Sequence, residues 1–141
     1  MRSCQPYEVS SSPEDIQAAM QEMDDSAEMA DQISYAYTLI RSDSQRDVMM
    51  GLDYLKHLRP QERDRAKVEY YTIFAMYRLN QDDQILKQYQ NRNNLHPNSV
   101  KIIETVKKEK NQDTAITVAA IFGTVATIVG VALTAIFSKR K

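Results

Sequence analysis

The segment 114–138, TAITVAAIFGTVATIVGVALTAIFS, contains 25 residues and no charged side chain. As an α-helix it would reach roughly 36 Å, because each residue adds about 1.5 Å. The hydrocarbon core of a bilayer is about 30 Å thick, so such a helix is long enough to cross it with some tilt. Only Lys139, Arg140 and Lys141 follow the segment. The sequence therefore predicts a tail-anchored protein, in which 114–138 is the transmembrane anchor and 139–141 a basic tail.

A helix buried in a soluble core is the alternative interpretation of this segment. Such a helix normally has a polar stripe, whereas 114–138 is apolar or carries only small polar residues on every side. Small residues recur every three or four positions along it, a spacing that lets two membrane helices pack closely. They are Ala119, Gly123, Ala126 and Gly130. A homo-oligomer held by this stripe is one hypothesis, and a stripe that only lowers the hydrophobicity of the anchor is the other.

The charge and the cysteine content describe the soluble part of the chain, which precedes the anchor. The whole chain has a net charge of −1, and three of its 18 basic residues lie in the tail. The rest is mildly acidic, which argues against nucleic acid as a partner. Cys4 is the single cysteine, so no intramolecular disulfide is possible. The N-terminus lacks the apolar run of a secretory signal. We expect residues 12–110 to form one cytosolic domain.

The apolar residues of 12–110 recur with helical periodicity. Helices are expected at about 13–23, 25–40, 45–58, 62–79, 83–93 and 98–110. The segment 25–40 has two apolar faces, which predicts that it lies between neighbouring helices. Prolines 60 and 97 end two similar helix pairs 37 residues apart, close to the tetratricopeptide period of about 34 residues. The expected fold is all-α: a six-helix tetratricopeptide-like bundle with a C-terminal transmembrane helix.

Local signals place the helix ends and one close contact. Ser12 is the expected N-cap of the first helix, with Pro13 in its first position. Asp25 is expected to cap the second helix together with Glu28. Gly51 lies inside the third helix, where glycine costs about 1 kcal/mol relative to alanine. Its presence there predicts a close approach to another helix.

Residues 1–11 form a short N-terminal arm with two possible states. Pro6 and the serines at 10–12 make a poor helix, which favours a flexible arm. The other possibility is an arm that folds back onto the domain, with Tyr7 and Val9 as its apolar contacts.

Several stretches resemble the mitochondrial fission 1 protein family. Residues 35–42, YAYTLIRS, and 47–55, DVMMGLDYL, are similar to its F-x-Y-A-W-x-L-V-x-S and D-x-x-x-G-x-x-L-L stretches. Residues 71–79, YTIFAMYRL, are similar to its Y-L-A-V-G-x-Y-R-L. The resemblance covers about 12–141, including the helix start at 13–16 and the anchor. The sequence departs from the family pattern at Tyr37, Ala75, Asp82, Ile85 and His96.

The resemblance implies an adaptor of the mitochondrial outer membrane, and often of peroxisomes, whose domain faces the cytosol. Such an adaptor recruits a dynamin-related GTPase, directly or through linkers, to a concave groove lined by the second and fourth helices. The arm can lie over that groove, and the basic tail acts in targeting. The groove positions carried over to this chain are Tyr35, Leu39, Arg41, Tyr71, Thr72, Ile73, Met76 and Arg78. Tyr35, Leu39, Tyr71 and Ile73 could equally be core, whereas Thr72, Met76 and Arg78 are expected at an accessible surface.

The sequence offers little for catalysis. It contains no H-E-x-x-H, C-x-x-C, P-loop or G-x-G-x-x-G pattern. The acidic pairs at 24–25 and 82–83 fall at expected helix starts, where they stabilise the helix dipole. We therefore expect no enzyme, no cofactor and no metal site. The function that competes with the fission adaptor is a tail-anchored tether that shapes membranes by self-assembly.

Overall fold

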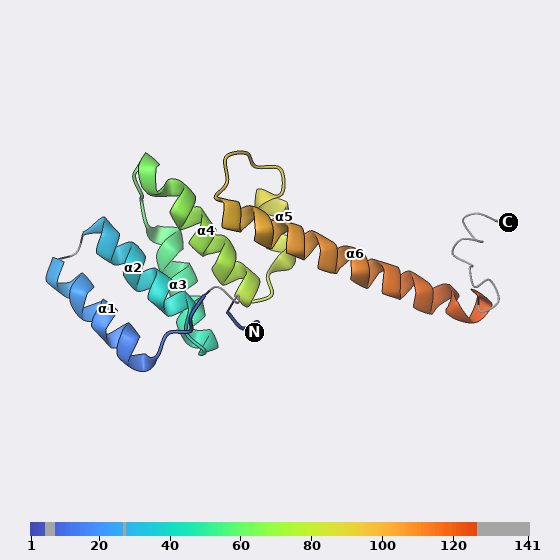
Figure 1. Cartoon of the computed structure of the whole chain (residues 1–141), viewed down its shortest axis with the longest axis horizontal. Coiled ribbons are helices and arrows are strands. Elements are labelled where there is room, and N and C mark those ends of the chain that lie inside the picture. The colour runs from blue at the N-terminus through green and yellow to red at the C-terminus, as the bar shows by residue number, and fades with distance from the viewer. Residues whose placement is uncertain (5–7, 27, 127–141) are drawn as a thin grey trace. The chain divides into compact units, whose positions relative to one another are not determined.

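A computed structural model describes residues 1–4, 8–26 and 28–126 (Figure 1). Within these ranges the chain forms six α-helices and no strand, which confirms the all-α prediction and is compatible with tetratricopeptide-like helix pairs. The helices are α1 (Pro13–Ser26), α2 (Met29–Ile40), α3 (Gln45–His57), α4 (Glu62–Arg78), α5 (Asp82–Tyr89) and α6 (Pro97–Ala126).

The chain divides into two units, Met1–Ile103 and Glu104–Lys141. The first unit holds α1 to α5 and the start of α6, and the second holds the rest of α6. The helix does not end near Lys110 as expected, because neither proline nor glycine interrupts the sequence before Gly123. Among the described residues, no helix is sufficiently long and apolar to cross a membrane. The second half of the predicted anchor, with Gly130 and the basic tail 139–141, lies outside the described residues.

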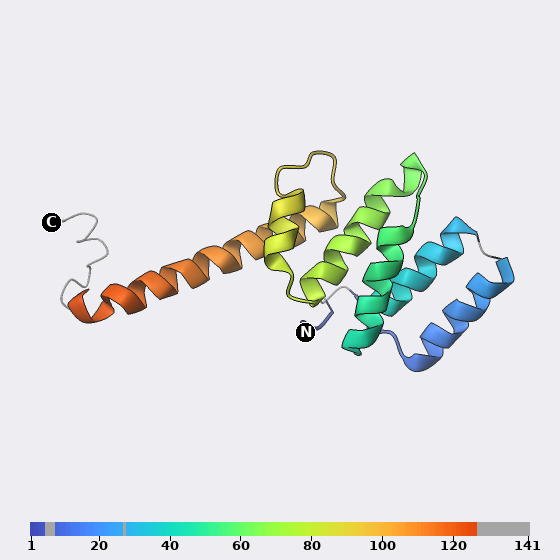
Figure 2. The ribbon, with the colours of Figure 1, turned by 180° about the vertical axis from the view of Figure 1, so that it is seen from behind.

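Helix α2 is the central element of the first unit. It contacts α1, α3 and α4, while α3 also packs on α4 and α4 on α5. Seen from behind, α2 lies between α1 and α3 (Figure 2). This arrangement buries both apolar faces of α2 and confirms that the helix lies between neighbours. The core is built mainly by α2, α3 and α4, with Ala36, Ile40, Val48, Ile73 and Phe74 fully buried.

Gly51 lies where α3 packs against α2. A Cβ atom at this position would come within 2.6 Å of Ile40 Cγ2, 3.0 Å of Leu39 Cβ and 3.1 Å of the Ala36 carbonyl oxygen. The last of these is backbone of α2, which cannot turn aside as a side chain can. The predicted close helix approach is therefore confirmed, and it explains a glycine inside a helix.

The helix ends agree with the sequence in part. The Ser12 Oγ atom accepts a hydrogen bond from the Asp15 backbone N–H at 3.1 Å, and Asp15 accepts one from the Ser12 N–H at 2.9 Å. Ser12 is thus the N-cap that was expected. The prediction for Asp25 is wrong, because α1 continues through it and Glu28 occupies the N-cap position of α2. An aspartate followed three residues later by glutamate has this spacing inside a helix as well as at its start.

Helix α5 is shorter than its sequence predicted, ending at Tyr89 rather than near residue 93. The Arg92 backbone N–H donates a hydrogen bond to the Tyr89 carbonyl at 3.0 Å, which closes a turn just after the helix. Asn94 then has a φ of 60°, in the left-handed region that asparagine tolerates. The turn therefore begins four residues earlier than expected for a helix at 83–93.

Candidate functional site

The N-terminal arm lies against the C-terminal ends of α2 and α4 (Figure 1). The Ser11 backbone N–H donates to the Arg41 carbonyl at 2.9 Å, and Arg41 Nη1 donates to the Val9 carbonyl at 3.0 Å. Ser11 and Ser42 form an isolated parallel bridge. The arm thus adds backbone hydrogen bonds to chain that has just left α2.

Glu8 inserts its carboxylate between two tyrosines from different helices. The Tyr70 hydroxyl of α4 donates to Glu8 Oε1 at 2.7 Å, and the Tyr37 hydroxyl of α2 donates to Oε2. Each carboxylate oxygen therefore has its own hydroxyl donor. We call Tyr37 and Tyr70 the carboxylate site.

Aromatic packing fixes the two hydroxyls of the carboxylate site. Tyr37 stacks on Tyr71, with ring centroids 4.2 Å apart and planes 17° from parallel. Tyr70 stacks on His96, with centroids 5.0 Å apart. Because both rings are held on their faces, the hydroxyls have little freedom to turn away from the arm.

Burial keeps the hydroxyls of these tyrosines protonated to higher pH than usual. The pKa of Tyr37 is raised well above its usual range, first by burial and then by its hydrogen bond to Glu8. The pKa of Tyr71 is raised by burial and by the nearby Glu8 charge. The Arg41 guanidinium, 4.4 Å from the centre of the Tyr37 ring, opposes both shifts. Tyr37 is therefore a neutral hydroxyl donor at physiological pH, as a carboxylate acceptor requires.

Arg2 is the second charged anchor of the arm. Its guanidinium forms a two-pronged ion pair with Asp82, at 2.6 and 2.7 Å, and donates to the Tyr77 carbonyl at 2.7 Å. The same group lies 4.0 Å from the centre of the Tyr77 ring. We call Tyr77 and Asp82 the arginine site. The side chains of Arg2 and Asp82 are only 23% and 27% exposed, so solvent screens this pair less than an ordinary surface pair.

Arg78 links the arm to the C-terminal ends of α2 and α4. The prediction that it is accessible is wrong. Only 1% of the residue is exposed. Its guanidinium donates to the carbonyl oxygens of Ile40 at 2.8 Å and Ser42 at 2.5 Å, and its Nε donates to that of Arg2 at 3.0 Å. Ile40 is the last residue of α2 and Ser42 follows its C-cap, so the guanidinium lies at the end of α2, where helix carbonyls lack partners within the helix. A cation is favoured there by the helix dipole as well.

The other residues predicted for the groove divide between core and surface. Tyr35, Leu39 and Ile73 are buried, whereas Arg41 and Tyr71 are partly exposed beside the arm. The accessible positions predicted for Thr72 and Met76 are wrong, because both are buried with the arm in place. The Thr72 hydroxyl donates to the Val68 carbonyl of its own helix at 2.8 Å. The physical reason is the central place of α4, which contacts α2, α3 and α5.

Two predictions about the arm contacts have different outcomes. Val9 is 75% exposed and is not an apolar contact of the arm. Tyr7 lies outside the described residues. The contacts that the structure describes are polar, made by Arg2, Glu8 and the backbone near Ser11.

Sequence reasoning missed the residues that receive the arm. The sequence marks Tyr37 as a family departure and Asp82 as a family departure within an acidic pair, and it gives no role to Tyr70, Tyr77, Arg2 or Glu8. The available signal was that residues 1–9 of the arm contain two charged side chains of opposite sign. No local pattern pairs those charges with residues more than 60 positions away.

An open pocket of about 760 Å³ lies where the arm meets the starts of α1 and α3, and it includes Ser11, Ser42, Asp43 and Asp47. Both of its aspartates accept hydrogen bonds from nearby serines. The Ser42 hydroxyl donates to Asp47 at 2.7 Å, and the Ser10 hydroxyl donates to Asp43 at 3.2 Å. These bonds fasten loops together, and neither histidine nor cysteine lines the pocket as a catalytic base or nucleophile. Across residues 1–4, 8–26 and 28–126, no cluster of three or more histidine, cysteine or acidic residues is arranged to hold a metal.

No model of a known protein family matches this chain, and a search of curated proteins found no match. The resemblance to the mitochondrial fission 1 protein family is neither supported nor contradicted by these searches. It stays a prediction from the sequence.

Proposed function

We propose that this chain is a tail-anchored adaptor of the mitochondrial outer membrane, and of peroxisomes, that recruits fission machinery such as a dynamin-related GTPase. The family resemblance of 35–55 and 71–79 supports the class of protein. The observation that carries the recruiting role is the surface where α2, α4 and the start of α5 receive the arm. We call it the arm face, made of Tyr37, Arg41, Tyr70, Tyr71, Tyr77 and Asp82.

The arm face has the properties of a peptide-binding surface. It holds the described parts of the arm, residues 1–4 and 8–11, by the backbone near Ser11 and by two charged side chains, rather than by apolar burial alone. Arg41 and Tyr71 stay partly exposed with the arm in place. A recruited protein reaches the whole face only when the arm leaves, so arm release is the step at which recruitment is controlled.

Microscopy of mitochondria tests this proposal. Cells would express the full chain, the chain ending at Lys110, or the full chain with Tyr71→Ala, each detected with an antibody so that the N-terminus stays native. The proposal expects the full chain on the mitochondrial surface with fragmented mitochondria. It expects a cytosolic signal for the truncated chain, and surface signal without fragmentation for Tyr71→Ala.

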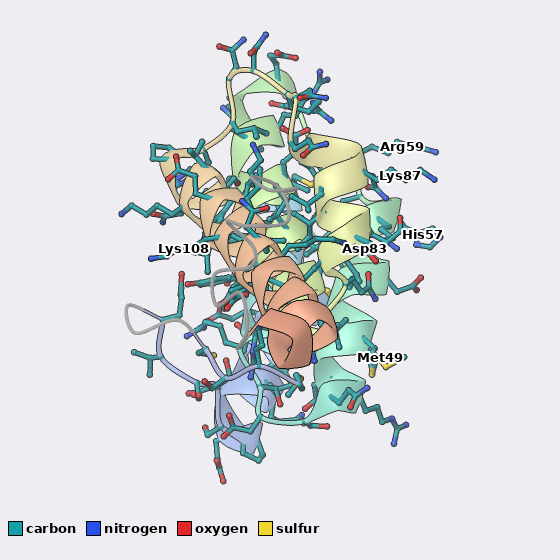
Figure 3. The ribbon with its side chains drawn as sticks, turned by 90° about the vertical axis from the view of Figure 1, so that its right-hand side faces the viewer. Met49, His57, Arg59, Asp83, Lys87 and Lys108 are labelled. Atoms are coloured by element: carbon teal, nitrogen blue, oxygen red, sulfur yellow. The ribbon has the colours of Figure 1, made fainter. Side chains whose placement is uncertain are left out.

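Met49→Ala is the matched control for the substitution in the arm face. Met49 lies on α3, is exposed, and points away from the helices that surround it (Figure 3). This variant should fragment mitochondria as the native chain does. Correct targeting with fragmentation by both variants would contradict the arm face as the recruiting surface. Loss of fragmentation by Gly123→Ile alone would favour the competing function, a tether that acts by self-assembly of its anchor.

A further inference from the structure

The arm places two charged side chains in two separate polar sites on the arm face. Arg2 occupies the arginine site and Glu8 the carboxylate site. They are six positions apart in the sequence, so a fully extended chain would place the two anchors at most about 20 Å apart. Such a pair of sites for opposite charges defines the chemistry and the direction of the segment that fits.

We propose that the arm is an internal copy of the partner's docking segment, and that the arm face selects a segment with an arginine followed, six positions later, by a glutamate. This inference rests on the proposed adaptor function and names the kind of segment that the recruited protein supplies. The occupant is a segment of that other protein, which displaces the arm and fills both sites.

The carboxylate site favours an acid over its amide. Two neutral hydroxyls converge on one side chain, and both donate to Glu8. A carboxylate accepts both bonds with charge assistance, which makes each about twice as strong as a neutral bond. Glutamine has only one carbonyl oxygen to offer. The positive charge of Arg41 beside Tyr37 adds to the preference for an anion.

The arginine site favours arginine over lysine. The Asp82 carboxylate receives two parallel N–H groups, and the Tyr77 ring lies against the flat face of the guanidinium. A lysine ammonium is a point charge that supplies neither the two-pronged pairing nor the stacking plane. Both sites therefore depend on the charge or shape of the side chain, which replacement by glutamine or lysine would remove.

The arm competes with any such segment because it is tethered to the same chain. Short flexible tethers give effective concentrations in the millimolar range. A partner segment with the same two anchors therefore binds weakly until the arm is released, and arm variants that lose Arg2 and Glu8 should bind it much more tightly.

The test uses the full chain in detergent micelles and a fluorescent peptide with the sequence of residues 1–11, in which Cys4→Ser prevents disulfide formation. Fluorescence polarisation would compare binding to the native chain and to the chain with Arg2→Ala and Glu8→Ala. We expect at least a tenfold tighter apparent affinity for the variant chain. Peptides with Glu8→Gln or Arg2→Lys should bind that chain roughly tenfold more weakly than the parent peptide, in line with the loss of one charge-assisted interaction.

A double-mutant cycle assigns the acid preference to the carboxylate site. In the arm-variant chain, Tyr37→Phe with Tyr70→Phe should weaken the parent peptide and leave the Glu8→Gln peptide nearly unchanged. Tyr54→Phe is the matched control, because its hydroxyl contacts Met23 and lies outside the arm face. The peptide substitutions keep the test decisive even where the tyrosine variants lose stability.

Equal binding of the parent and Glu8→Gln peptides would overturn the proposal. So would concentration-dependent dimers of the native chain that vanish with Glu8→Gln, because the segment in the site would then come from a second copy. The expected mitochondrial phenotype of Tyr71→Ala does not depend on the result of the peptide test. The two proposals can therefore fail separately.

Discussion

Arg2 and Arg78 exchange two hydrogen bonds. The backbone N–H of Arg2 donates to the Arg78 carbonyl oxygen at 2.8 Å, and Arg78 Nε donates to the Arg2 carbonyl oxygen at 3.0 Å. The same guanidinium reaches Ile40 and Ser42. One side chain therefore links the arm, the end of α2 and the end of α4, and the closed state of the arm depends on a residue buried beneath it.

Replacing Arg78 should destabilise the domain. Arg78→Met removes the shared donor and leaves buried carbonyl oxygens without a partner, which costs on the order of 3 kcal/mol. Urea unfolding of the full chain in micelles, followed by circular dichroism, would measure the loss. Arg65→Met is the control, because Arg65 is exposed and pairs with Glu62 at the surface. A difference below about 0.5 kcal/mol between the two variants would show that surrounding groups replace these bonds.

Breaking the arginine site should free the arm with little effect on the bundle. Arg2→Gln removes the ion pair with Asp82, so the Ser11 and Arg2 amides should exchange with solvent several-fold faster while the core amides of α4 stay protected. Asp82→Asn should have the same effect, and combining the two should add little. Hydrogen exchange by NMR would measure each amide.

The neighbouring acid of α5 provides the control for that experiment. Asp83 is exposed and follows Asp82 directly, and its side chain is seen at the surface of α5 (Figure 3). Asp83→Asn changes the net charge equally but leaves the arginine site intact. Faster exchange of the arm in this variant would mean that general charge, not the pairing with Arg2, holds the arm.

Adding one methyl group at Gly51 should destabilise the bundle, although alanine is the better helix former. The new Cβ would lie 3.1 Å from the Ala36 carbonyl oxygen, so α2 and α3 must separate. Overpacking of this kind typically costs about 1–3 kcal/mol, and the gain in helix propensity offsets about 1 kcal/mol. We expect a net loss of about 1 kcal/mol in thermal unfolding. Met50→Ala, on the exposed side of the same helix, should be nearly neutral, and a more stable Gly51→Ala would contradict the close contact.

Tyr37 should lose its hydroxyl proton only at a pH well above that of an ordinary tyrosine. The pKa of Tyr37 is raised from an ordinary value of 10.0, first by burial and second by its bond to Glu8. A pKa raised in the folded state contributes stability that is complete below pH 10 and is lost as the pH rises through the folded value. When tyrosine ionisation is followed by ultraviolet absorbance, the Tyr37→Phe variant should therefore show one fewer tyrosine that ionises at high pH than the native chain. In Glu8→Gln, Tyr37 should ionise at a lower pH than in the native chain, and an unchanged titration would argue against the bond.

The sequence determined the elements and much of their order. Helical periodicity, the Ser12 cap and the turns near Pro60 and Pro97 depend on residues three or four positions apart, so they can be read locally. Gly51 was a readable signal too, because a glycine inside a helix has a cost that a close helix contact explains. The anchor segment 114–138 was proposed from composition alone, and its second half lies outside the described residues.

Only the tertiary structure decided which side chains face the arm. Glu8 and Tyr70 are 62 positions apart, and Arg2 and Arg78 are 76 apart. No periodicity connects residues at such distances, since their meeting depends on how α2, α4 and the arm pack together. The same packing buried Arg78, which the sequence had placed at the surface: an arginine is normally exposed unless several acceptors converge on it, and that convergence exists only in the folded chain.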